Sequence, residues 1–150
     1  MAVIRDRPYS NANFLVDLGW GDSRSATMGF AEVIFPPCTI GNTDWRPDDS
    51  MASQGTGPSD IAVDKHITLK RGVIGSLDLY KWWDQARRGK APQRRTLKIE
   101  LLSDDHSTVV LTWRFRNVRP VSLCYSPLRA IEGGILMETV VLAFDSMEMK

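Results

Sequence analysis

Histidine and cysteine, two residues that many enzyme and metal sites use, are scarce in this sequence. The chain has 150 residues, of which 2 are histidine and 2 are cysteine. Cys38 and Cys124 are too few for a disulfide framework, and we expect both to be reduced thiols. No apolar run approaches the ~20 residues of a membrane span. The fold must therefore rest on a buried core, which one domain over residues 1–150 can supply.

The scarce chemical groups do not form a recognisable site. His66, His106 and the two cysteines lack the spacing of metal ligands. Ser107 follows His106 directly, but a nucleophilic triad depends on geometry and not on adjacency. The glycine-containing segment 55–58 lacks the lysine of a phosphate loop. We therefore expect no cofactor, no metal and no enzymatic activity.

Net charge is also low. It is +1, which argues against a dedicated nucleic-acid binder. The composition, with 43% hydrophobic and 25% charged residues, is typical of a globular protein. The charge is unevenly distributed, however. Residues 1–65 hold 5 Lys/Arg and 9 Asp/Glu, and residues 66–150 hold 14 and 9, so the net charges are −4 and +5. This split indicates either a contact surface or merely solvated faces.

Alternating apolar and polar residues predict a mainly β protein. Residues 14–20 alternate, and residues 28–35 form a second β-rich run after a turn signal at 21–23. These two segments are predicted to form a hairpin. The segment 118–125 is predicted to be a strand of its own, bent at Pro120. Further strands are predicted at 67–70, 97–101 and 109–116.

One helix is predicted at about 77–88. Ser76 is a candidate N-cap, and Gly89 can close the other end. Four apolar residues recur at the spacing of a single buried helical stripe, and we expect them to pack on the sheet. They are Leu79, Trp82, Trp83 and Ala86.

A long loop is predicted from about 36 to 64. Its composition is dominated by small and polar residues, and Trp45 is its one aromatic residue. Loops of this length in a compact domain are usually functional or disordered. The loop is too short to be a domain of its own.

The last strand, predicted over about 135–144, is apolar on both faces. Leu136 and Val140 lie on one face, and Met137 and Val141 lie on the other. A strand that is apolar on both faces is normally buried on both. The helix or a neighbouring subunit must therefore cover the second face.

Several segments in a fixed order carry a family resemblance. Residues 67–82 place a strand that ends in Leu-Lys-Arg-Gly before a helix that opens with leucine and holds a tryptophan. Residues 113–120 form an aromatic strand closed by a proline, and residues 138–143 form an apolar final strand. Together with residues 8–16, these segments resemble the tail-tube proteins of contractile phage tails and related injection systems. The segment that follows residue 35 departs from that family.

The resemblance implies a mainly β (α+β) fold, a small antiparallel β-barrel or sandwich with one flanking helix. It implies hexameric rings that stack head to tail into a hollow tube. The implied partners are further copies of the chain, a sheath protein, baseplate or tube-end proteins, and DNA or protein cargo in the lumen, with no membrane insertion. Such a protein would be made in the bacterial cytoplasm without a signal peptide and assembled into a virion or phage-tail-like particle.

Within this family, the chain can be the main tube subunit or a specialised end ring, either a tube initiator or a terminal adaptor. A ligand-binding β-barrel is an alternative from a different class, although residues 109–115 resemble a filled core. Two sets of residues are predicted to make assembly contacts. The predicted inter-ring residues are Trp45, Asp48, Asp49 and Asp60. The predicted residues between subunits of one ring are Met137, Thr139 and Val141.

Overall fold

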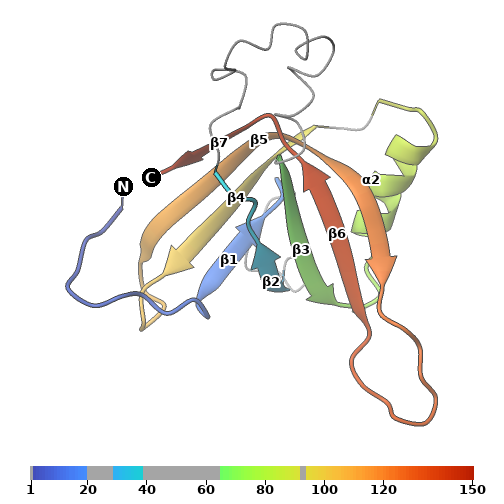
Figure 1. Cartoon of the computed structure of the whole chain (residues 1–150), viewed down its shortest axis with the longest axis horizontal. Helices are drawn as coiled ribbons and strands as arrows, with labels where there is room; N and C mark the ends of the chain where they lie inside the picture. Colours follow the sequence, from blue (N-terminus) through green and yellow to red (C-terminus); the bar gives the residue numbers. More distant parts are fainter. Residues whose placement is uncertain (1, 20–28, 39–64, 92–93) are drawn as a thin grey trace, which may run out of the picture.

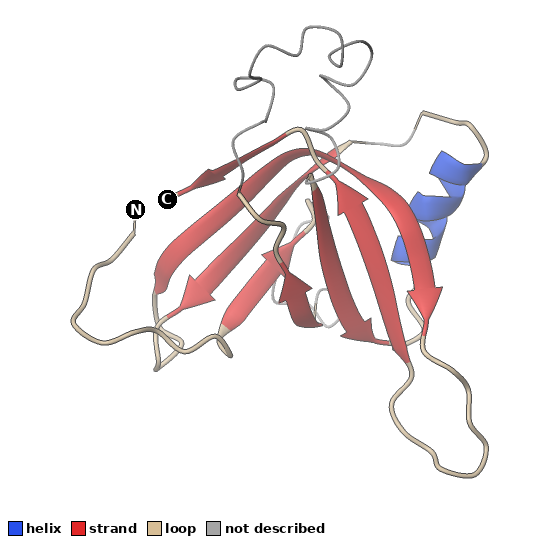
Figure 2. Cartoon of the chain, in the orientation of Figure 1, coloured by secondary structure: helices blue, strands red, loops and turns tan. Residues whose placement is uncertain are grey.

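The protein is built on one antiparallel β-sheet. In the computed structural model, residues 2–19, 29–38, 65–91 and 94–150 are described (Figure 1). The mainly β class with one helix beside the sheet is therefore confirmed for the described part of the chain (Figure 2). The elements are β1 (Phe14–Asp17), β2 (Phe30–Ile34), β3 (His66–Gly72), α2 (Asp78–Arg87), β4 (Arg95–Leu102), β5 (Val109–Tyr125), β6 (Met137–Ala143) and β7 (Ser146–Met149).

The strand order places β1 and β2 at opposite ends of the sheet. The order is β1-β4-β5-β6-β3-β2, and β7 pairs with β5 away from this path. Phe14 of β1 lies opposite Leu101 of β4, and Phe30 of β2 lies opposite Arg71 of β3. The hairpin predicted from the first two strands is therefore wrong. Over the described strands the sheet curls around its core but does not close into a barrel (Figure 1).

Strand β5 runs through the whole sheet. It is 17 residues long and continues past Pro120, where the sequence predicts a separate bent strand. Its first part pairs with β4 and β7, and its last part pairs with β6. Asn117 has a φ of 55°, and a register shift between Pro120 and Ser122 marks a bulge. Bulges bend a strand and tolerate a proline, which cannot donate to the ladder.

The strand predicted over 135–144 corresponds to β6, and a further strand, β7, follows it. Strand β6 ends at Ala143 and β7 begins at Ser146, and the short break between them turns the chain across β5. Asp145 holds this break in place, because its backbone N–H donates to the carbonyl of Arg116 and its carboxylate accepts from Asn117 Nδ2, each at 3.0 Å. Strand β7 itself was not predicted from the sequence.

The core lies on the concave side of the curled sheet. Phe115 of β5 is at its centre, and its ring meets the Phe144 ring edge-on at 4.8 Å between centroids. Side chains at alternate positions of the strands converge on it, as period-two geometry requires. The core cluster contains Val16, Leu18, Phe30, Ile67, Leu69, Leu79, Trp82, Leu97, Ile99, Phe115, Val118, Val140, Leu142 and Phe144.

Helix α2 packs on this same core. Leu79 and Trp82 are 1% and 3% exposed, whereas Trp83 and Ala86 are only partly buried. Leu77, and not the predicted Ser76, occupies the N-cap position, although Ser76 Oγ accepts a hydrogen bond from the Asp78 N–H at 3.4 Å. The helix therefore joins the concave side of the sheet and leaves the convex face of β6 uncovered.

The two adjacent tryptophans give a direct test of this packing. Trp82→Ala should lower the free energy of unfolding by about 3–5 kcal/mol, as large core truncations do. Trp83→Ala is the matched control and should lower it by about 1 kcal/mol. Chemical denaturation of both variants measures the difference. Equal losses would contradict the packing of α2 described above.

Candidate functional site

The described residues do not assemble a metal centre. No three His, Cys, Asp or Glu side chains in this part of the chain are grouped so that they could hold a metal ion. His106 lies in the turn between β4 and β5, and the Ser107 hydroxyl donates to Asp105 Oδ1 at 2.7 Å. This hydrogen bond and a second from Ser103 lower the pKa of Asp105 to about 2. The cluster is thus a turn network around an ionised carboxylate.

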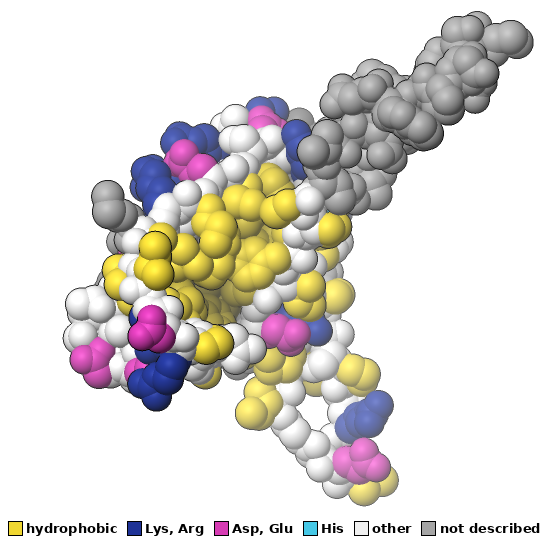
Figure 3. All heavy atoms as spheres, turned by 60° about the vertical axis from the view of Figure 1, so that its left-hand side comes forward, with side chains coloured by type: hydrophobic (Ala, Val, Ile, Leu, Met, Phe, Trp, Pro, Cys, Tyr) yellow, Lys and Arg dark blue, Asp and Glu magenta, His cyan; other side chains and the backbone are white. Residues whose placement is uncertain are grey.

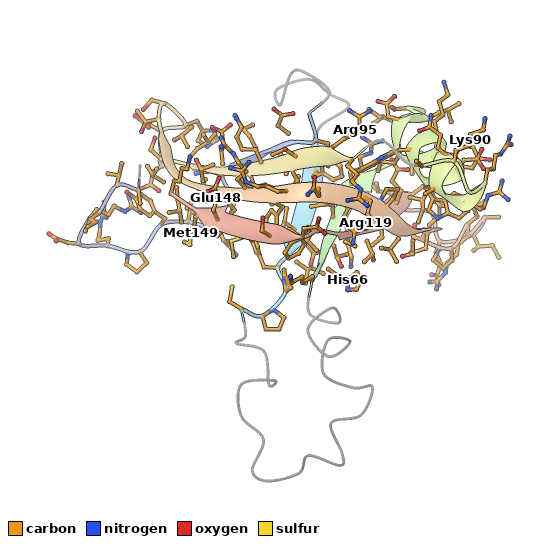
Figure 4. The ribbon with its side chains drawn as sticks, turned by 90° about the horizontal axis from the view of Figure 1, so that it is seen from above. His66, Lys90, Arg95, Arg119, Glu148 and Met149 are labelled. Carbon is orange, nitrogen blue, oxygen red and sulfur yellow. The ribbon has the colours of Figure 1, made fainter. Side chains whose placement is uncertain are left out.

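The convex surface of the sheet has two regions of different chemistry. Over β4, β5 and β7 it is charged, with Glu148 at its centre. Arg116 donates to Glu148 at 2.8 Å, and Arg114 lies 3.6 Å away, so the pKa of this carboxyl is lowered, chiefly by the Arg116 hydrogen bond. Figure 4 shows Glu148 on β7 and Lys90 beside α2 at the other end of the molecule.

Over β3, β6 and the end of β5, the convex surface is mostly uncharged. The predicted intra-ring residues of β6 lie here and are partly exposed. In the strand pairing, Val141 is flanked by Thr68 and Ser122, and Thr139 is flanked by Lys70 and Cys124. We call the surface formed by Thr68, Lys70, Ser122, Cys124, Met137, Thr139 and Val141 the β6 face; Lys70 is its charged member.

The β6 face lies in the middle of the sheet and not at its edge. Strand β6 is hydrogen-bonded to β5 on one side and β3 on the other. It therefore cannot extend the sheet into another subunit by strand pairing. The free edges of the described sheet belong to β1, β2, β7 and the last part of β5, which pairs with β6 on one side only. Any contact made by Met137, Thr139 or Val141 must be made by the side chains of the face.

A buried ion pair ties β3 to β6 below this face. Arg71 Nε donates to Glu138 Oε1 at 2.5 Å, and the two side chains are 1% and 4% exposed. The guanidinium also lies over the Phe30 ring at 5.4 Å. Burial, followed by the charge of Glu138, raises the pKa of Tyr125. The sequence gives no sign of this pair, because its members are 67 residues apart and meet only in the final register.

The opening between the two ends of the sheet forms an apolar groove. Its lining includes Phe14 of β1, Val33 of β2 and Phe35, which follows β2. The Phe35 ring stands 4.9 Å from that of Trp113 on β5. We call this feature the β1–β2 groove; it is visible as an apolar hollow in Figure 3. The predicted inter-ring residues Trp45, Asp48, Asp49 and Asp60 lie outside the described residues.

A comparison with family models decides the class of the protein. Residues 10–148 match the model described as T4-like virus tail tube protein gp19. The chain belongs to this tail tube family. It is thus a structural tail tube protein of a contractile phage tail or a related injection system. No curated protein matches its sequence significantly.

Solved structures share the fold of this tail tube protein. A sheath–tube complex of an extracellular contractile injection system, PVC, is 20% identical with a TM-score of 0.68, covering 95% of this chain and 91% of that one. The anti-feeding prophage tube terminating cap is 21% identical with a TM-score of 0.70, covering 100% and 95%. Hcp1 from Flavobacterium johnsoniae is 12% identical with a TM-score of 0.60, covering 91% and 94%.

The buried pair of this tail tube protein can be tested by removing one or both charges. Glu138→Leu should lower the free energy of unfolding by about 3–5 kcal/mol, because it leaves a buried guanidinium without its carboxylate. The double variant Arg71→Met/Glu138→Leu should recover most of that loss. Glu148→Leu, at the exposed pair, is the control and should change stability by about 0–1 kcal/mol. Denaturant unfolding of all three distinguishes the buried pair from the exposed one.

Proposed function

We propose that the chain forms hexameric rings that stack head to tail into a hollow conduit. The observation that carries this proposal is the β6 face, a mostly uncharged surface in the middle of the sheet that α2 leaves uncovered. Free strand edges at β1, β2 and β7 support it further, because unpaired edges invite a partner. In a ring, each subunit contacts the next one through two different surfaces, so both the β6 face and the free strand edges can meet a neighbouring subunit.

Within a ring, we assign the β6 face to the boundary between subunits. Apart from Lys70 its side chains are uncharged, whereas the convex surface over β4, β5 and β7 holds several ion pairs. Removing the first kind of surface from water requires the desolvation of fewer ions. The contact is made face-on, since β6 has hydrogen-bonded strands on both sides.

Between rings, the contact is assigned to the segment from 36 to 64. That segment holds five aspartates and Arg46, and the half of the chain after residue 65 has a net charge of +5. Head-to-tail stacking brings unlike surfaces together, so opposite charges can meet. Trp45 is its candidate anchor, because binding energy concentrates in aromatic residues.

The remaining partners follow from the tube itself. A sheath protein would surround it, baseplate or tube-end proteins would contact its ends, and DNA or protein cargo would pass through its lumen. Assembly would begin in the bacterial cytoplasm and finish in a virion or phage-tail-like particle. No helix in the described ranges is both long and apolar enough to cross a membrane.

A specialised end ring is the second candidate function. The fold is as similar to the anti-feeding prophage tube terminating cap, with a TM-score of 0.70, as to the PVC sheath–tube complex, with 0.68. An end ring would use the same contacts within the ring but stack through one side. Electron microscopy of the purified protein separates the two candidates, because a tube subunit gives long tubes and an end ring gives single or paired rings. A monomer at high concentration would contradict both.

The β6 face is tested by adding a charge to it. Val141→Asp should abolish rings, because each subunit boundary would then bury an unpaired carboxylate. Val141→Thr is the control and should assemble, since it keeps the shape without a charge. Circular dichroism checks the fold, and sedimentation velocity measures the rings. Normal rings from the aspartate variant would remove the β6 face from the boundary.

The stacking segment is tested separately. Trp45→Ala, or deletion of residues 50–60, should leave folded rings that stack poorly. Exposed charge pairs contribute only about 0–1 kcal/mol each and are screened by salt, so stacking should also weaken as salt rises. Tube lengths counted by electron microscopy at low and high salt give the result. Tubes of wild-type length and salt response would exclude this segment from the ring-to-ring contact.

A further inference from the structure

The loop between β5 and β6 exposes an unusual amount of apolar surface. It spans residues 126–136 and projects beyond the sheet (Figure 1). Leu128, Ile131 and Ile135 are 85%, 97% and 79% exposed. Scattered apolar side chains on a surface are normal, but a cluster on one projecting segment is typical of an interaction site.

The base of this loop is fixed by hydrogen bonds. The Ser126 N–H donates to the Met137 carbonyl, and the Met137 N–H donates back to Ser126 Oγ, each at 2.9 Å. The Val73 N–H donates to the Leu136 carbonyl at 2.9 Å, which ties the loop to the end of β3. The buried pair of β3 and β6 lies one residue further along the strands. The loop is thus held in an extended position on a rigid base.

The second apolar surface of the protein is the β1–β2 groove. Its volume is about 420 Å³, and its walls include Phe14, Phe35, Leu101 and Trp113. Glu32 is the charged residue of its lining; its side chain is 56% exposed and lies 3.8 Å from the Lys70 ammonium. The groove is a furrow open to one side and not an enclosed cavity, and in Figure 3 the projecting loop lies well away from it. The loop and the groove of one chain therefore do not meet.

We propose that the β5–β6 loop of one copy inserts Leu128 and Ile131 into the β1–β2 groove of the next copy. This inference rests on the proposed self-assembly and adds a further contact between copies to those assigned above. Arg129, between the two apolar residues, then approaches Glu32 at the groove. Because the two surfaces differ, the contact is heterologous and each copy offers one loop and one groove.

The charges favour a second copy over the other occupants. Arg129 and Glu132, which are 65% and 75% exposed, form an ion pair at 3.5 Å beside Ile131. Insertion of this tip into a lipid bilayer would place both charges in the apolar phase, which is strongly unfavourable. An open protein groove instead lets the Arg129–Glu132 pair stay in water at the rim, where the exposed Glu32 carboxylate adds a favourable charge for Arg129.

The loop is tested with a pair of matched variants. Leu128→Ser/Ile131→Ser should stay folded, because both side chains are exposed, and should lose rings and tubes in sedimentation and electron microscopy. Glu132→Ser in the same loop is the control and should assemble as the wild type does. If the wild type assembles and the double serine variant assembles equally well, the loop contact is overturned while the proposed tube function stands. If the wild type does not assemble, it is the proposed function that fails.

A photocrosslinker at position 131 identifies the occupant of the groove. In assembled protein, we expect crosslinks to peptides that contain Phe14, Phe35 or Trp113 of another copy. Isotope-labelled and unlabelled chains mixed before assembly show that the crosslink joins different molecules. Crosslinks within one chain or to other surfaces overturn the proposal. Flotation of the wild type, but not of the double serine variant, with anionic phospholipid vesicles would identify a membrane as the occupant and would also overturn it.

Complementation between variants gives an independent result. Phe35→Asp puts a charge into the groove and leaves the loop intact. Mixed with the Leu128→Ser/Ile131→Ser variant, it should form 1:1 pairs in native mass spectrometry, since one intact loop and one intact groove remain. Neither variant alone should pair. Absence of pairs in the mixture, with the wild type assembling under the same conditions, would contradict the proposal.

Discussion

The bend of β5 is the constraint on which the rest of the structure depends. One strand of 17 residues pairs with β4 and β7 along its first part and with β6 along its last part. Asn117 and the bulge after Pro120 let it change direction without ending. A sheet bent in this way encloses a single core on its concave side. Helix α2 packs on that core, and no second sheet is needed to cover it.

The outer surface of the molecule carries different side chains on the two sides of this bend. Over β4, β5 and β7 the charged side chains satisfy one another through Glu148. Over β6 the outward side chains are mostly uncharged, and at the end of the β5–β6 hairpin they are apolar. A subunit of a homopolymer needs such a division, because some of its surface must remain in water while the rest meets copies of itself.

The features that depend on local sequence pattern were predicted correctly. Alternation located most of the strands, the spacing of Leu79 and Trp82 located the helix, and the resemblance led to the correct family. Strand partners depend on distant residues, so β1 and β2 were wrongly paired. Strand β7 was missed because four residues with two methionines give a weak pattern. The Arg71–Glu138 pair depends on register, which alternation cannot fix. The assembly contacts depend on other copies of the chain, and their assignment stays a prediction.

The strand order also governs when the fold can form. Arg71 of β3 and Glu138 of β6, two paired strands within the sheet, are 67 positions apart in the sequence. Strand β1 can pair only after β4 has been synthesised. Pairings between such distant segments make folding slow, since the entropy of closing a long loop is lost before contacts compensate for it. During synthesis, β3 has no partner for its inner edge until β6 has left the ribosome. The nascent chain therefore passes through a period with unpaired apolar strands, in which a chaperone that binds extended segments would raise the yield of soluble subunits.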